Sequence, residues 1–256
     1  MIDAHCHISI PKFNNEPNPL LNLIPDFKKE LEFVIDSAAS PIDAKISLDL
    51  TEKHKGFIFS TLGLHPVDAL ELNDKEIENY IEFIKENKDK IIGIGEVGLD
   101  YHYHKQDAEI KRSKEIFLQF IELAKEFNLP LVLHLRKAEE DGFKMVVDND
   151  VKKVMFHFFS GKKDLAMEIV NEGYYISIPV IMLKSKTMKK VVKAIPLENL
   201  LTETDSPWAS PFDEPFNKPT NIKYEIEKIS ELKNLDKKIV EKQITENAKK
   251  LFGMNF

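Results

Sequence analysis

The chain of 256 residues is poor in cysteine, arginine and tryptophan, and it contains no long apolar run. Its one cysteine, Cys6, excludes an internal disulfide and is typical of the reducing cytosol. No apolar stretch approaches the roughly 20 residues of a membrane-spanning helix, so no membrane partner is expected. The first apolar run starts at residue 2, so no signal peptide is expected either. Together these absences predict a cytoplasmic protein.

Positive charge comes almost entirely from lysine, since Arg112 and Arg136 are the only arginines. The formal net charge of −7 argues against a nucleic-acid binder that relies on a broad basic surface. A small basic patch beside a catalytic centre stays compatible with this charge. The sequence contains no internal repeat and no low-complexity segment, and its length allows a full-sized core. We therefore predict a single domain over residues 1–256, with an oligomeric state that the sequence leaves open.

Short apolar or β-branched runs alternate with amphipathic stretches along the chain. Eight runs are expected to be strands: Met1–His7, Leu31–Ala38, Gly56–Leu62, Ile91–Glu96, Leu129–Leu135, Val154–Phe158, Tyr174–Ile178 and Leu200–Thr204. Six stretches are expected to be helices: Asp74–Asn87, Ala108–Phe127, Lys163–Glu172, Ser185–Ile195, Asn221–Leu232 and Asp236–Phe252. Alternating strands and helices predict a parallel sheet, and eight units predict a (β/α)8 TIM barrel. A doubly wound sheet is the alternative, although it normally has fewer strands.

Polar residues of metal-ligand type stand at or just after the ends of these predicted strands. His5 and His7 are two residues apart, so their side chains point to the same face of an extended strand. The C-terminal ends of barrel strands meet at one rim, so distant residues converge there. The other candidates are His65, Glu96, His134, His157 and Asp205. Imidazoles and carboxylates bind divalent ions, and the surplus of ligands predicts two ions (Zn, Mn or Mg) bridged by one carboxylate.

Taken together, the motifs resemble the TatD family of metal-dependent deoxyribonucleases, which belong to the amidohydrolase-like barrels. The resemblance extends over almost the whole chain. The matching segments are Asp3–His7, Gly63–Pro66, Gly95–Tyr101, His134–Ala138, His157–Gly161, Thr202–Pro207, Asn247–Ala248 and Leu251–Gly253. The family usually follows its first motif with Leu-Asp, where this chain has Ile8–Pro11. It commonly has a basic residue before its Asn-x-Pro, where this chain has Glu214–Phe216 before Asn217–Pro219. Both departures lie in the expected substrate loops.

The resemblance also implies a role for each matched position. His5, His7 and Asp205 look like ligands of a first metal, His134 and His157 like ligands of a second, and Glu96 like the bridge. Glu96 and Asp205 would be the catalytic residues, with Asp205 taking the proton of the attacking water. The substrate-binding residues would be His65, Arg136 and Glu203, with His65 and Arg136 on the phosphate. The implied activity is hydrolysis of DNA or another phosphodiester by a metal-bound hydroxide.

Two other functions fit the same ligands. A carbonyl substrate such as an amide, lactone or aminoacyl-tRNA ester would use the same chemistry, and the acidic charge favours it. A metal-binding scaffold without catalysis is the third possibility, against which the full ligand set argues.

Three further residues stay open. His102 and His104 form a second His-x-His pair, for which a substrate loop or solvent exposure is expected. Trp208 is expected at the rim of the site, where base stacking and loop packing are both compatible with its position.

Overall fold

The computed structural model describes residues 1–254, so residues 255–256 of the predicted domain lie outside the described residues. Its main sheet contains eight strands, each hydrogen-bonded in parallel to the next along the chain. The strands are β1 (Ile2–Cys6), β4 (Phe33–Ala38), β5 (Ile58–Leu62), β6 (Gly93–Asp100), β7 (Leu131–Arg136), β8 (Val154–Phe156), β9 (Tyr175–Pro179) and β10 (Leu200–Glu203). A small hairpin of β2 (Lys12–Phe13) and β3 (Glu16–Pro17) lies in the loop after β1.

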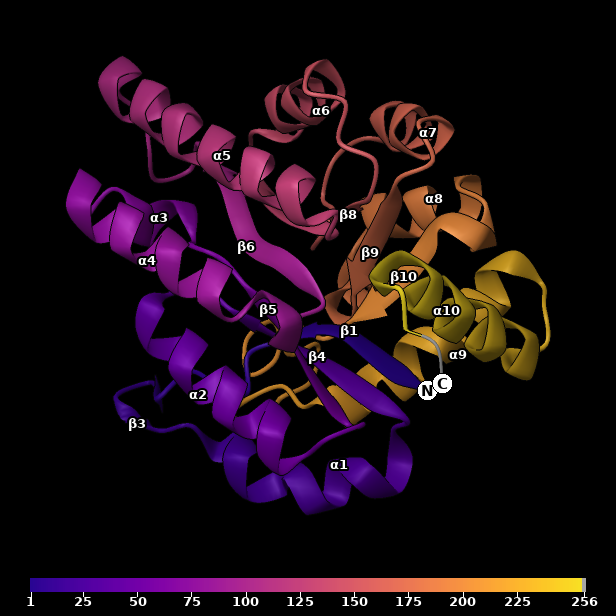
Figure 1. The fold of residues 1–256 in the computed structure, drawn as a ribbon. Coiled ribbons are helices and arrows are strands. Elements are labelled where there is room, and N and C mark those ends of the chain that lie inside the picture. Colours follow the sequence, from indigo (N-terminus) through magenta and orange to yellow (C-terminus); the bar gives the residue numbers. More distant parts are fainter. Residues whose placement is uncertain (255–256) are drawn as a thin grey trace.

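Helices surround this ring of strands on its outer side, as Figure 1 shows. The α-helices are α1 (Ile24–Glu30), α2 (Pro41–Lys53), α3 (Pro66–Ala69), α4 (Asp74–Glu86), α5 (Asp107–Phe127), α6 (Glu139–Asp148), α7 (Lys163–Asn171), α8 (Lys186–Ala194), α9 (Ile222–Lys233) and α10 (Lys237–Phe252). The 3-10 helices are η1 (Pro19–Leu23), η2 (Lys88–Lys90), η3 (Val180–Lys184), η4 (Leu197–Asn199) and η5 (Pro219–Asn221). Within residues 1–254, no helix combines the length and the apolar character that crossing a bilayer requires.

The ring nearly closes where the first strand meets the last. The segment after β10 runs beside β1, and the Asp205 N–H donates to the His5 carbonyl at 3.0 Å. One step further, the His7 N–H donates to the Ser206 carbonyl at 2.8 Å. The strand order is sequential all the way round, which confirms the predicted (β/α)8 barrel and excludes a doubly wound sheet.

All six predicted helices are confirmed, and their ends differ from the prediction by about one residue, within the usual uncertainty. The N-terminus of α4 has a capping box, in which Asn73 and Glu76 each accept a backbone N–H of the other. Helix α2 is not among the predicted helices, because its buried face includes Asp43 and Ser47 beside Ala44 and Leu50. Polar residues on the buried face weaken the apolar periodicity by which helices are predicted.

Strand β6 differs most from its prediction. It runs to Asp100 instead of ending at Glu96, and all its residues are buried. Neighbouring segments approach its backbone closely. If Gly63 were replaced by a larger residue, the added Cβ would lie 2.5 Å from the Glu96 carbonyl oxygen, which is too close. A Cβ added at Gly98 would lie 2.1 Å from the His134 carbonyl oxygen. Glycine at these two positions therefore allows β5, β6 and β7 to pack around Glu96.

Candidate metal centre

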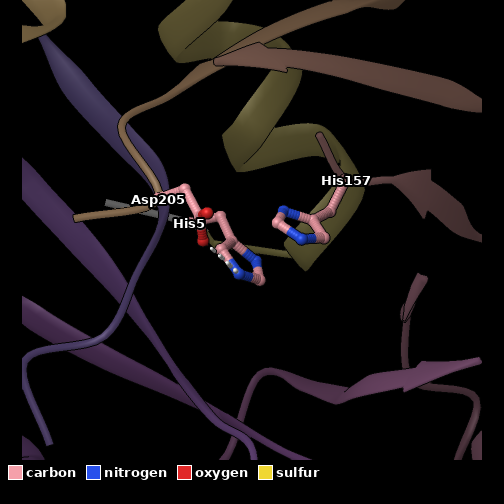
Figure 2. Close-up of side chains that lie close together, drawn as sticks. All are labelled: His5, His157 and Asp205. Atoms are coloured by element: carbon pink, nitrogen blue, oxygen red, sulfur yellow. Dashed lines mark ion pairs between the residues drawn. The ribbon is translucent and has the colours of Figure 1, made fainter. Parts of the chain in front are cut away.

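His5, His7 and Asp205 are brought together by the seam that nearly closes the barrel. The hydrogen bond from the Asp205 N–H to the His5 carbonyl sets the register of the two segments. The Nε2 atoms of His5 and His7 lie 3.1 Å apart. Asp205 Oδ1 lies 3.2 Å from His7 Nε2 and 3.8 Å from His5 Nε2. Figure 2 shows Asp205 beside His5, whose ring stacks on that of His157 with centroids 3.7 Å apart.

Glu96 extends into the barrel from β6 and faces two groups of imidazoles with its two oxygens. Its Oε2 lies 3.4 Å from Nε2 of both His5 and His7. Its Oε1 lies 2.6 Å from His134 Nδ1 and 3.3 Å from His157 Nε2. The carboxylate is buried, with 3% of its side-chain surface exposed. One carboxylate oxygen per group is the arrangement that a bridging ligand requires.

The spacing of the ligand atoms fits divalent cations. Bonds of about 2.1 Å to four tetrahedral ligands place the ligand atoms about 3.4 Å apart. His5 Nε2 and His7 Nε2 lie 3.1 Å from each other and 3.2 to 3.8 Å from Glu96 Oε2 and Asp205 Oδ1, which matches this value. The second group has one atom from each of three residues, Glu96, His134 and His157. Three protein ligands leave coordination positions for water or substrate, as in catalytic sites.

The other ring nitrogens of His5, His134 and His157 are held by buried partners, whereas His7 Nδ1 has no hydrogen-bond partner among the described residues. Glu203 Oε1 accepts a hydrogen bond from His157 Nδ1 at 3.1 Å, and Asp100 Oδ2 lies 3.2 Å from His134 Nε2. Ser37 Oγ lies 3.1 Å from His5 Nδ1. The ring nitrogen opposite each contact is directed at the centre. A neutral imidazole carries its proton on one nitrogen only, so a proton on the contacted nitrogen leaves the opposite one free to bind a cation. Such partners fix the orientation of metal-binding histidines.

The position of Glu203 differs from the predicted contact with substrate. Its side chain is fully buried, and it also accepts the Phe158 N–H at 2.9 Å and a short hydrogen bond from the Ser177 hydroxyl. It lies behind His157, where a substrate has no access. The physical reason is its place as the last residue of β10, two residues before Asp205 and therefore deeper in the barrel.

The sequence reasoning gave no role to Asp100 or Ser37. Asp100 was missed because β6 was expected to end at Glu96. Residues four apart in a strand share a face, so continuation of β6 would have placed Asp100 beside Glu96. No signal in the sequence distinguishes Ser37 from other serines.

A cavity of about 690 Å³ opens above the centre. Its lining includes His65 and Arg136, the two residues predicted to contact a phosphate, together with Glu96, His134 and Asp205. The Val67 N–H donates to His65 Nδ1 at 3.3 Å, so the His65 proton is on Nε2, which faces the Glu96 side. Burial and the neighbouring His134 lower the pKa of His65 to about 4. His65 is therefore a neutral hydrogen-bond donor at physiological pH.

The carboxylates of the centre are held in their charged form. Burial alone would raise the pKa of Glu96, but the charge of His157 and the hydrogen bonds of His134, His157 and His5 hold it well below its usual range. Burial has the same effect on Asp205, where the His7 hydrogen bond and the charge of His157 outweigh it and lower the pKa. Conversely, burial opposes protonation of His7, but Asp205 and Glu96 raise its pKa to about 9.

Metal affinity is therefore expected to depend on pH. Without a cation, His7 with its pKa of about 9 carries a proton at pH 7, and a cation must displace that proton. The association constant should rise about tenfold per pH unit between pH 6.5 and 8.5 for each proton released. Competition of Mn²⁺ or Zn²⁺ between the protein and a chelator of known affinity measures this slope. Equal affinity at pH 6.5 and 8.5 would contradict the expectation.

Glu203→Gln should weaken the binding of one metal ion by about 10- to 100-fold, since the partner that orients His157 loses its charge. The amide oxygen can still accept the Phe158 N–H, which limits structural damage. Asp36→Asn is a matched control, because Asp36 is equally buried but contacts Ile8 N, Ser9 N and Ser47 Oγ and no imidazole. Calorimetric titration with Mn²⁺ should show weakening in the Glu203 variant alone; equal weakening in both would show a general loss of structure.

The second His-x-His pair does not join the centre. His104 is buried, and its Nδ1 lies 2.9 Å from Ser113 Oγ of α5. It therefore anchors the turn after β6 to a helix, and its burial excludes the solvent-exposed alternative for this residue. His102 stacks edge-on against Tyr103, with ring centroids 4.9 Å apart.

Comparisons with known proteins agree with this geometry. Residues 2–253 match the family model described as TatD related DNase. An uncharacterised metal-dependent hydrolase of Methanocaldococcus jannaschii is 39% identical, over 98% of this chain and 96% of its own length. Human deoxyribonuclease TATDN3 is 32% identical, over 98% of this chain and 94% of its own. The crystal structure of the TatD homologue YjjV from Escherichia coli superposes with a TM-score of 0.87 at 23% identity, covering 100% of this chain and 98% of that one. The chain belongs to the TatD-related DNase family.

Proposed function

We propose that this protein is a metal-dependent hydrolase that cleaves phosphodiester bonds of DNA with two divalent cations. The observation that carries the proposal is the position of Glu96, whose two oxygens each face a separate group of imidazoles. The TatD-related family and the name of the human relative support DNA as the substrate. We propose that the protein acts in the reducing cytosol, which the single cysteine supports.

In this proposal His5, His7 and Asp205 hold the first cation, His134 and His157 hold the second, and Glu96 binds both. When bound, the cations would lower the pKa of a coordinated water and offset the charge that develops at phosphorus. Manganese, zinc and magnesium all fit a mixed set of imidazoles and carboxylates. The protein's contribution is to hold these ligands in place, through Glu203, Asp100 and Ser37.

Asp205 is the residue that accepts the proton of the attacking water. Its low pKa keeps it ionised at neutral pH, which a proton acceptor requires. It is also the most accessible carboxylate of the first group, with 16% of its side chain exposed against 3% for Glu96. A base must reach the reacting water, so Asp205 is better placed for this role than the buried Glu96.

His65 and Arg136 bind the phosphate group. His65 presents a neutral Nε2–H to the cavity, and a hydrogen bond from this group does not depend on pH near neutrality. Arg136 contributes a permanent positive charge and a planar set of donors that suits phosphate oxygens. His65 precedes α3 and Arg136 is the last residue of β7, so they reach the cavity from different elements and together orient the scissile phosphate over the cations.

A carbonyl substrate is the second candidate, favoured by one observation. Two carboxylates that belong to neither metal group, Asp43 and Asp68, also line the cavity, and their charge opposes a polyanion. Burial and the nearby Glu71 raise the pKa of Asp68 to about 6, so its negative charge is present at pH 7. An uncharged ester or amide would not be repelled by these side chains.

Parallel assays with Mn²⁺-loaded protein discriminate between the two functions. The substrates are a single-stranded DNA oligonucleotide, bis-p-nitrophenyl phosphate, and a panel of esters, lactones and amides. Cleavage of the oligonucleotide that is lost with a chelator and restored with Mn²⁺ would support the proposal. Turnover of carbonyl substrates without cleavage of either phosphodiester would overturn it.

A further inference from the structure

Two exposed aromatic residues stand at the mouth of the cavity, and neither has a role in holding cations. Tyr103 follows β6 and is 58% exposed, and Trp208 follows β10 and is 43% exposed. Both line the cavity. A large aromatic ring exposed to water loses the favourable free energy of burial, so two such rings at one cavity mouth indicate a ligand that covers them.

Each ring is fixed relative to a residue of the metal centre. The backbone N–H of Trp208 donates to the Asp205 carbonyl at 3.0 Å. The indole ring packs in a T-shaped arrangement with the His7 ring, with centroids 5.0 Å apart. The Tyr103 N–H donates to Asp100 Oδ1 at 3.2 Å, and Asp100 holds His134. One aromatic residue is thus tied to the first group of ligands and the other to the second.

The loop that contains Trp208 is also anchored from behind. Asn217 is fully buried; its backbone N–H donates to the Pro207 carbonyl, and its side-chain amide donates to the Thr204 carbonyl, both at 2.8 Å. Phe13 of the β2–β3 hairpin packs edge-on against the indole, with centroids 6.1 Å apart. The two neighbouring rings are inclined at 76° and 75° to the indole, so neither is stacked parallel on it, and 43% of the Trp208 surface stays exposed.

On the other side, Tyr103 pairs with the residue that is proposed to bind the phosphate. The Arg136 guanidinium lies 5.6 Å from the centroid of the Tyr103 ring. Arg136 is the only arginine or lysine among the described residues that line the cavity, and Asp43 and Asp68 line it too. Attraction between lysines and phosphates therefore contributes little to holding a strand here, and other contacts must supply the affinity.

We propose that Trp208 and Tyr103 are base-stacking positions, which hold the two nucleosides flanking the scissile phosphate of single-stranded DNA. This inference rests on the proposed phosphodiesterase function. Stacking uses the face of a base, which every base has, so little sequence preference is expected. In a duplex the base faces are covered by neighbouring pairs, so paired DNA cannot occupy these positions without fraying. The substrate class is therefore a single strand or an unpaired end.

Binding can be measured separately from cleavage because Trp208 is the only tryptophan of the chain. We expect a thymidine pentanucleotide to quench the tryptophan fluorescence of metal-free protein, which does not cleave it. A pentamer of the same length with tetrahydrofuran in place of every base should leave the fluorescence unchanged, and a blunt duplex should quench far less. Equal quenching by the base-bearing and the baseless strand would overturn the inference.

Cleavage gives the second test. Trp208→Ala and Tyr103→Ala should each lower kcat/KM on single-stranded DNA by about tenfold or more, mainly through KM. Neither change should affect cleavage of the baseless strand, and Trp208→Phe and Tyr103→Phe should restore most of the loss. Tyr224→Ala is the matched control, because Tyr224 is 41% exposed on α9 and does not line the cavity.

The outcomes separate the inference from the function on which it rests. Wild-type cleavage of DNA with both alanine variants unaffected would overturn the stacking positions alone. Absence of DNA cleavage in the wild type, with quenching that still depends on the bases, would overturn the proposed function and support the stacking positions. Absence of both cleavage and quenching would overturn both.

Discussion

Glu96→Ala is expected to lower kcat/KM on single-stranded DNA by about 10³-fold or more. The carboxylate is the one ligand shared by both groups of imidazoles, so its loss removes a ligand from each cation at once. Offsetting charge in the transition state is worth several kcal/mol, and about 4 kcal/mol corresponds to three powers of ten in rate. Metal analysis of dialysed protein should show fewer ions per chain than in the wild type.

Glu96→Gln is the control variant that separates the charge of the side chain from its size. It keeps the size of the side chain and one oxygen ligand, but it removes the charge that compensates the surrounding imidazoles. We expect a loss of activity close to that of alanine, with a fold that circular dichroism finds unchanged. Full metal-dependent activity in either variant would show that Glu96 is no bridge, and the proposed mechanism would then be wrong.

Asp205→Asn should give the second large effect, a fall in kcat of about 10²- to 10⁴-fold, the usual contribution of a general base. Asparagine keeps an oxygen that can bind the first cation but accepts no proton at neutral pH. Metal content should therefore change little, whereas Asp205→Ala should lose both metal and activity. Comparing the two variants separates the ligand role of Asp205 from its role as a base.

The pH profile gives an independent readout of Asp205. Its pKa lies below the usual value for an aspartate, so the wild-type residue stays ionised from about pH 5 upward. The fall in kcat should consequently be the same at every pH between 5 and 9, without a change in the shape of the profile. A profile whose acidic limb disappears in Asp205→Asn would instead assign that limb to Asp205 and contradict the low pKa.

The stacking positions and the metal centre affect different kinetic parameters. Changes at Glu96 and Asp205 should lower kcat, because these groups act on the reacting atoms. Changes at Trp208 and Tyr103 should raise KM, because they hold parts of the substrate that do not react. Among the departures from the TatD pattern, Ile10 of Ile8–Pro11 lines the cavity and is expected to affect substrate choice, whereas no residue of Glu214–Phe216 lines it.

The sequence by itself determined the eight barrel strands, six of the helices and the residue types of the centre. Alternation of apolar runs and amphipathic stretches predicted all eight barrel strands, because buried strands and surface helices have different apolar periods. The His-x-His spacing placed His5 and His7 on one face, because side chains alternate along a strand. The barrel fold then implied that His65, Glu96, His134, His157 and Asp205 share one rim, and the structure does bring them together.

Only the tertiary structure decided which of these residues form each group of ligands and which residues orient the histidines. The two oxygens of Glu96 face different groups because β6 passes between β5 and β7 at a position where Gly63 and Gly98 allow close contact. Glu203 holds His157 from behind, and Asp100 holds His134, because strand register sets which side chains meet across the barrel. Register and the closing seam depend on contacts between segments up to about 200 residues apart, which no local pattern encodes.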